Sequence, residues 1–403
     1  MELKDLLRFF RENTLLAFIC ALVIVGSVVV PLVVYFNETS TKLSDFERYY
    51  NTARTILDGN GDLIYNYEYT EMDYRYFPSF AIIIIPFALL DLQVAYVLFI
   101  LLNMIVFVFG IKEMRKIGRL IGVEINHVIL VIIILPSFSI VLIMGQNVLL
   151  VVTMIMFSFR SFLENKVFSS GIFLGISSLL KPVTIFIMIL MLVTFFRKRN
   201  FKMLLKFFLG VIIPLIPDII IFASYSTLLH SFVSSSIFHS DFRTDASSIS
   251  LISFFYYVFD IKFIYFVVPG LIILLPYFYK KKDIEKCFNK EDTIKIFTLG
   301  TVLHFVFFVD IWHSQLVIVN FFISLLWSCK GNWKDPLKPV VFIDLFLLPM
   351  LFIPINNPIG TMFQFAAIFI WVVVVCKALN YHVPIQTENT QNSIVTGLKQ
   401  RIR

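Results

Sequence analysis

Charged residues are scarce in this 403-residue chain. Asp, Glu, Lys and Arg together make up 15% of it and hydrophobic residues 59%, whereas soluble globular proteins carry about 25% charged residues. Cysteine is rarer still, and the four cysteines lack the spacing of metal ligands. The composition therefore excludes an ordinary soluble globular protein, and we expect no metal site held by cysteines.

Long apolar runs recur from one end of the chain to the other. Runs of about 20 apolar residues are what a helix needs to cross a membrane, and these runs are continuous rather than alternating, which favours helices over a barrel. We therefore expect an all-α polytopic membrane protein with about twelve transmembrane helices. Residues 1–380 would form a single transmembrane domain, and residues 381–403 a polar cytoplasmic tail.

The orientation follows from the basic residues, because short cytoplasmic loops are enriched in Lys and Arg. Both termini are then cytoplasmic, and residues 37–91 and 225–260 form outer loops. We expect the apolar run 77–90 to lie in the membrane interface or to re-enter the membrane, since crossing would place KEMRKIGR (112–119) outside, against the rule. The first outer loop thus contains interfacial helices. The main expected spans are 14–36, 92–111, 125–144, 147–163, 167–180, 183–196, 203–224, 263–279, 293–309, 316–328, 340–354 and 361–376.

With this topology, unusual polar residues gather on the outer side of the membrane. Arg75, Lys181 and Arg243 break the rule that cations lie inside, and cations beside helix ends suit an anionic ligand such as a phosphate. The other polar outer residues include acids, amides and an aromatic–histidine pair: Asp45, Glu47, Gln146, Asn147, Trp312 and His313.

Simpler interpretations of these residues remain open. Asn147 in the Gly145-Gln146-Asn147 turn is also typical of a helix cap. Asp45 and Glu47 fit the acidic first turn of a helix. The tyrosines of the first outer loop fit interfacial anchors, although tyrosine also suits sugar stacking.

The order of several motifs resembles that of a known group of enzymes. These motifs are Asp45-x-x-x-Tyr49-Tyr50, LDGN (57–60), YRYFP (74–78), GQN (145–147), GIFLGISSLLKP (171–182) and Trp312-His313. The set is similar to integral membrane glycosyltransferases of the C-type fold, and more narrowly to family 87, the polyprenyl-phosphate-mannose-dependent mannosyltransferases. The chain departs from the family pattern at Phe77-Pro78, at the shortened GQN and at the single His313, which leaves the sugar and the acceptor open.

The resemblance implies an inverting transfer of a hexose, expected to be mannose, from a polyprenyl- or dolichyl-phosphate donor. The acceptor would be a hydroxyl of a lipid or glycan at the outer face of the cell membrane. By position Asp45 would be the general base, and Glu47 would orient it or bind a metal. The remaining expected site residues contact the donor phosphate (Arg75, Lys181, Arg243 and His313) or the substrates (Tyr49, Tyr74, Tyr76, Gln146, Asn147 and Trp312).

We expect no cofactor, because these cations suit a lipid monophosphate better than a metal-bound diphosphate, although paired acids leave Mg²⁺ or Mn²⁺ open. No nucleic-acid partner is expected.

Two other functions compete with glycosyl transfer. A transporter or flippase would use ionisable groups within the spans, such as Asp218 or Asp344. A polysaccharide polymerase or ligase would place its catalytic residues in the late outer loop 225–260.

Overall fold

The computed structural model describes residues 45–66, 70, 74–125, 144–236, 290–307 and 315–328, with isolated positions between 130 and 142. Within these ranges the regular structure is helical throughout. The elements are α3 (Asp45–Leu57), η1 (Gly61–Leu63), α5 (Pro78–Ala88), α6 (Leu92–Ile121), α8 (Val148–Leu163), α9 (Val167–Leu180), η2 (Pro182–Thr184), α10 (Ile185–Arg197), α11 (Phe201–Ser224), α12 (Ser226–Ser236), α15 (Lys290–Phe307) and α16 (Leu316–Ser328).

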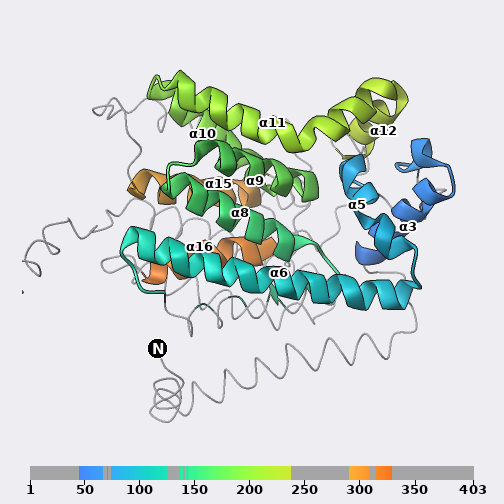
Figure 1. The fold of residues 1–403 in the computed structure, drawn as a ribbon, viewed down its shortest axis with the longest axis horizontal. Coiled ribbons are helices and arrows are strands. Elements are labelled where there is room, and N and C mark those ends of the chain that lie inside the picture. The colour runs from blue at the N-terminus through green and yellow to red at the C-terminus, as the bar shows by residue number, and fades with distance from the viewer. Residues whose placement is uncertain are drawn as a thin grey trace, which may run out of the picture.

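Helices α6, α8, α9 and α11 lie side by side in that order, and α8 and α9 occupy the middle (Figure 1). Most residues of α8 are buried, because α6, α9, α15 and α16 all contact it. The short helices α3, α5 and α12 gather at one end of this bundle (Figure 1). We call this the α3 end; α6 and α8 begin toward it, and α9 and α11 end toward it (Figure 1).

Two of the described helices are long and apolar enough to cross a membrane. They are α6, with 30 residues, and α11, with 24, and only 28% and 22% of their most apolar windows are buried in the protein. Large apolar side chains are exposed along both, for example Ile105 and Ile220. An exposed apolar surface of this length suits lipid rather than water. The chain is a membrane protein.

Helices α9 and α11 approach each other closely because glycines face each other between them. A Cβ atom on Gly171 would lie 2.4 Å from the carbonyl oxygen of Phe207, and one on Gly210 would lie 2.3 Å from that of Phe168. Small residues allow helix backbones to approach in membranes. This contact fixes α11 against the middle of the bundle.

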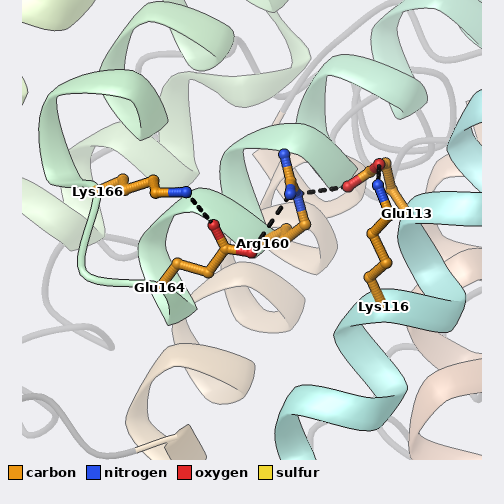
Figure 2. Close-up of polar contacts among 5 residues, drawn as sticks. All are labelled: Glu113, Lys116, Arg160, Glu164 and Lys166. Atoms are coloured by element: carbon orange, nitrogen blue, oxygen red, sulfur yellow. Dashed lines mark hydrogen bonds and ion pairs between the residues drawn. The ribbon is translucent and has the colours of Figure 1, made fainter.

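A network of ion pairs joins α6, α8 and the start of α9 at the end of the bundle opposite α3 (Figure 2). Arg160 on α8 contacts Glu113 on α6, with Nε 2.5 Å from Oε2, and Glu164, with Nη1 3.3 Å from Oε1. Lys116 and Lys166 complete it at 2.6 Å from Glu113 and 2.7 Å from Glu164. The hydrogen bond from Lys166 lowers the pKa of the Glu164 carboxyl. Glu113 is buried, and its two cationic partners offset the free-energy cost of burying its charge.

Several expected spans coincide with observed helices. The bounds expected for 167–180 and 316–328 are those of α9 and α16, and 147–163 and 203–224 differ from α8 and α11 by one or two residues at their starts. Helix α5 has 11 residues, about 16 Å, which is too short to cross a membrane unaided. The expected spans near 263–279, 340–354 and 361–376 lie outside the described residues.

Two helices add detail that the expected spans did not give. Helix α6 continues beyond the expected span 92–111 through KEMRKIGR (112–119), because Lys, Glu, Arg and Met are good helix formers and Gly122 ends the helix in the left-handed conformation. Residues 226–236, within the expected outer segment 225–260, form α12. The Phe232 ring on α12 packs against Phe77 and Phe222, with centroids 5.1 and 5.3 Å away, and this packing favours a helix despite the many serines.

Candidate active site

The Asp45 carboxylate lies at the first residue of α3 and is held by two side chains. Gln146 donates a hydrogen bond from Nε2 to Oδ2 of Asp45. Arg48, one turn along α3, places Nη1 3.3 Å from Oδ1. The Asp45 side chain is 18% exposed, so it remains accessible while it is oriented. The carboxylate is therefore fixed at the α3 end, where a ligand can reach it.

The turn that carries Gln146 fits closely against α3. Gly145 has a φ of +59°, a conformation that a side chain disfavours. A Cβ atom there would lie 2.7 Å from Cβ of Phe46 and 2.8 Å from the ring of Tyr96. The Tyr96 hydroxyl in turn donates to the carbonyl of Leu142, at 2.7 Å. Glycine at 145 thus allows Gln146 to reach Asp45.

Replacing Gly145 with alanine should lower stability by about 2–3 kcal/mol, because the strain of positive φ adds to the contact with Phe46 and Tyr96. Gly122→Ala is the matched control: its φ is +80°, but nothing lies within 4 Å of an added Cβ. Thermal unfolding of the detergent-solubilised protein measures both. A Gly145→Ala variant no less stable than Gly122→Ala would contradict the close fit.

Asn147 connects this turn to the end of α9. It stands before the first residue of α8, yet its side chain makes no capping hydrogen bond. Instead Nδ2 donates to the carbonyl oxygen of Leu180, at 2.7 Å. Asn147 is fully buried. Asn147 is therefore the cap residue of α8 in position, as expected, but its side chain does not cap the helix and instead fixes the peptide that leads into Lys181.

Lys181 lies in an extended conformation between α9 and η2 and is only 9% exposed. The chain is held there by hydrogen bonds from its backbone N–H to Ser177 and from Val183 to its carbonyl. The Lys181 ammonium is within electrostatic range of the His304 ring on α15. A buried ammonium is costly unless an anion or acceptors surround it. Of the residues expected to contact the donor phosphate, the structure describes Arg75 and Lys181. Lys181 is the more buried of these two.

His304 and Gln315 add a second polar pair near Lys181. The Nε2 atom of His304 lies 2.8 Å from Oε1 of Gln315, and both side chains are buried. The pair joins α15 to the start of α16.

The tyrosines expected to bind substrate form a packed cluster. Tyr49, Tyr74 and Tyr76 are 0%, 1% and 8% exposed. The hydroxyls of Tyr49 and Tyr76 are 3.0 Å apart and their rings meet edge to face. Burial raises the pKa of both Tyr49 and Tyr74 well above its ordinary value, so the hydroxyls stay protonated. The structure gives these residues a packing role, and sugar stacking by them stays a prediction.

The other expected site residues divide in two. Glu47, in the first turn of α3, and Arg75, between the buried Tyr74 and Tyr76, are both half-buried. Arg243, Trp312 and His313 lie outside the described residues, and their roles stay predictions. Across the described ranges, no group of three His, Cys, Asp or Glu side chains is placed to hold a metal ion.

Sequence reasoning did not assign Arg48, His304 or Gln315 to the site, although His304 had been noted as an ionisable residue toward the end of an apolar span. Arg48 could have been found, because residues three apart on a helix are neighbours and an Asp–Arg pair at that spacing is favourable. His304 and Gln315 carry no such signal. Their contact depends on how α15 and α16 pack.

Comparison with known proteins supports the family that the motifs suggested. The sequence model of glycosyltransferase family 87 matches residues 74–279, which is more than half of the chain. No curated protein matches the chain. The matched region contains Arg75, Gln146, Asn147 and Lys181, whereas Asp45 precedes it and enters the site through its contact with Gln146. The chain belongs to glycosyltransferase family 87 and is a glycosyltransferase.

Proposed function

We propose that this glycosyltransferase moves a hexose from a polyprenyl or dolichyl phosphate to a hydroxyl of a lipid or glycan acceptor. Mannose is the hexose that we propose. The transfer inverts the anomeric centre and takes place at the outer face of the cell membrane. The enzyme would have the C-type fold, with about twelve spans and both termini in the cytoplasm.

The proposal rests on one observation. Two adjacent residues of one turn contact the expected base and the residue directly before the lysine that is expected to bind phosphate. Gln146 holds the Asp45 carboxylate, and Asn147 holds the carbonyl of Leu180, directly before Lys181. A carboxylate and a buried ammonium are the two groups that this transfer needs, one for the acceptor proton and one for the departing phosphate. The turn ties both to one rigid element.

In the proposed reaction, Asp45 removes the proton from the acceptor hydroxyl as that oxygen attacks the anomeric carbon. The bond from that carbon to the phosphate oxygen breaks, and the phosphate leaves with the electron pair. Lys181, with Arg75, Arg243 and His313, would stabilise the charge on the leaving phosphate. The chemistry needs no cofactor. Both oxygens of Asp45 already interact, one with Gln146 and one with Arg48, and a metal ion would compete with the arginine.

Helix α5 supports a lipid-linked donor. It is short, apolar and close to α3. Ile82 and Ile83 on it are 46% and 52% exposed, and Leu89, directly after it, is 67% exposed. Exposed apolar side chains on a helix too short to span suit the membrane interface. A polyprenyl tail could then stay in lipid while its phosphate reaches the α3 end.

The transporter alternative loses one of its supports. Asp218 was a candidate ion-coupling group within a span, but both of its oxygens accept hydrogen bonds from Ser79. Asp344 lies outside the described residues. The polymerase or ligase alternative depended on residues 225–260, of which the structure describes α12 alone, a serine-rich helix with no acidic residue.

The test is consumption of a lipid-phosphate sugar by the purified full-length protein. Polyprenyl-phosphate mannose, polyprenyl-phosphate glucose and the nucleotide-linked sugars are offered separately, to the wild type and to Asp45→Ala. We expect the wild type to release polyprenyl phosphate from one lipid donor and the variant to release none above background. Consumption of a nucleotide sugar in preference to both lipid donors would contradict the proposed donor class.

A further inference from the structure

Asp218 is a buried carboxylate in the last third of α11, 1% exposed. Its Oδ1 accepts a hydrogen bond from the backbone N–H of Ser79 at 2.8 Å, and its Oδ2 accepts one from the Ser79 hydroxyl at 2.5 Å. Ser79 is the second residue of α5. The residue before that helix, Phe77, offers no side-chain cap. Asp218 therefore caps α5 from 139 residues away, and its charge is favourable at a helix N-terminus.

The segment that leads into α5 is held at its carbonyl groups as well. The Tyr65 hydroxyl donates to the carbonyl of Tyr76 at 2.7 Å, and the Tyr74 hydroxyl donates to that of Phe77 at 3.0 Å. The charge of Asp218 also acts on the Tyr65 and Tyr74 rings, so these groups are close together. The path of residues 74–79 is thus set by hydrogen bonds on both sides of Pro78.

Residues 74–79 contact α3 mainly through the side chains of Tyr76 and Tyr49. The Tyr76 hydroxyl lies 3.0 Å from that of Tyr49, and Tyr49 also packs edge to face on Phe80 of α5, with centroids 5.0 Å apart. Tyr49 follows Asp45 by four residues on α3, and residues at that spacing lie on the same face of a helix. Any shift of the α5 start is therefore transmitted to the face of α3 that presents Asp45.

We propose that Asp218 is a positioning residue for the transfer reaction: by capping α5 it sets α3 so that the Asp45 carboxylate meets Gln146. The inference rests on the proposed role of Asp45 as the base. Displacing a reacting group by about 1 Å can reduce turnover about 100-fold. Hydrogen bonds join Asp218 of α11 to Ser79 and Tyr76 to Tyr49 of α3, and the backbone of residues 76–79 connects these two contacts.

The experiment compares Asp218→Asn, Asp218→Glu and Ser79→Ala in the full-length protein, with kcat and the donor KM as the readouts. We expect Asp218→Asn to lower kcat about 10–100-fold with a KM change below about threefold, because the base is misplaced and not the donor site. Ser79→Ala should lose less, since the backbone N–H still donates to Asp218. Asp218→Glu keeps the charge and should restore part of the lost turnover.

Hydrogen exchange supplies a readout that does not depend on activity. Residues 45–57 should exchange faster in Asp218→Asn than in the wild type, as α3 loses its fixed contact with α5. Glu113→Gln is the matched control, because Glu113 is also a buried carboxylate, 4% exposed, but lies at the opposite end of the bundle. It should lower the melting temperature while leaving kcat and exchange in α3 unchanged.

Three results would overturn the proposal: an unchanged kcat in Asp218→Asn, a loss no greater than that of Glu113→Gln at equal melting temperature, or unchanged exchange in α3. Failure of the proposed function looks different. If Asp45→Asn remains active, Asp45 is not the base, and faster exchange of α3 in Asp218→Asn would then support only the contact between the two helices.

Discussion

Replacing Asp45 with asparagine should reduce glycosyl transfer by about 10²–10⁴-fold, the usual contribution of a general base. Asparagine has the same shape and can still accept the hydrogen bond from Gln146, but it cannot take a proton. The fold should therefore persist and kcat should fall, while the donor KM changes little. The measurement is the rate of product formation with saturating lipid-phosphate donor, alongside the melting temperature of each variant.

The matched control for this variant is Asp58→Asn. Asp58 directly follows α3 and is exposed, so its loss should change the rate less than about twofold. Glu47→Gln separates the two acids of the first turn. If Asp45→Asn keeps its turnover and Glu47→Gln loses it, the base is Glu47. If both variants remain active, no carboxylate of this turn is the base.

Hydrophobic periodicity and run length were sufficient to predict most of the described helices. The apolar run of α9 lies between Lys166 and the Lys181-Pro182 step. These residues set its predicted bounds, because charged residues and proline are unfavourable inside such helices. The length of α6 was underestimated. Its last turns are basic, and the prediction treated charge as the end of a helix when it marks only the end of the apolar part.

The residues of the site could be predicted only in part. Asp45, Gln146, Asn147 and Lys181 stood out because polar groups are rare at apolar helix ends. Their contacts could not be predicted, since Asp45 and Gln146 are 101 residues apart and meet only through the packing of α3 against the bundle. Asp218 shows the same limit: an acid within an apolar span left ion coupling open beside a packing role, and only the packing shows that it lies where another helix begins.

The tyrosines show how composition can mislead. A tyrosine-rich outer loop is typical of interface anchoring or sugar binding. In the structure Tyr49, Tyr74 and Tyr76 fill the interior between α3 and α5, with their hydroxyls bonded to one another or to carbonyls. A tyrosine serves in a core when its hydroxyl finds a partner, and that partner is invisible in the sequence.

Replacing Lys181 with methionine should reduce kcat/KM for the donor by about 10²–10³-fold. The ammonium is 9% exposed and would stabilise the charge that develops on the leaving phosphate. Methionine fills a similar volume without the charge, so most of the packing around residue 181 is kept. The melting temperature is measured alongside the kinetics. A loss of kcat/KM larger than any loss of stability explains is the expected signature of a phosphate-binding lysine.

A buried lysine with a structural role should behave in the opposite way. Lys198 is 12% exposed and pairs with Asp292 at 3.1 Å, at the end of the bundle opposite α3. Lys198→Met should lower the melting temperature and leave kcat/KM within about twofold.

Inhibition by the product, polyprenyl phosphate, then separates Lys181 from Asp45. Lys181→Met should weaken this inhibition about tenfold or more, and Asp45→Asn should not. Equal inhibition of Lys181→Met and the wild type would mean that the phosphate binds elsewhere, with Arg75, Arg243 and His313 as the cations to replace next.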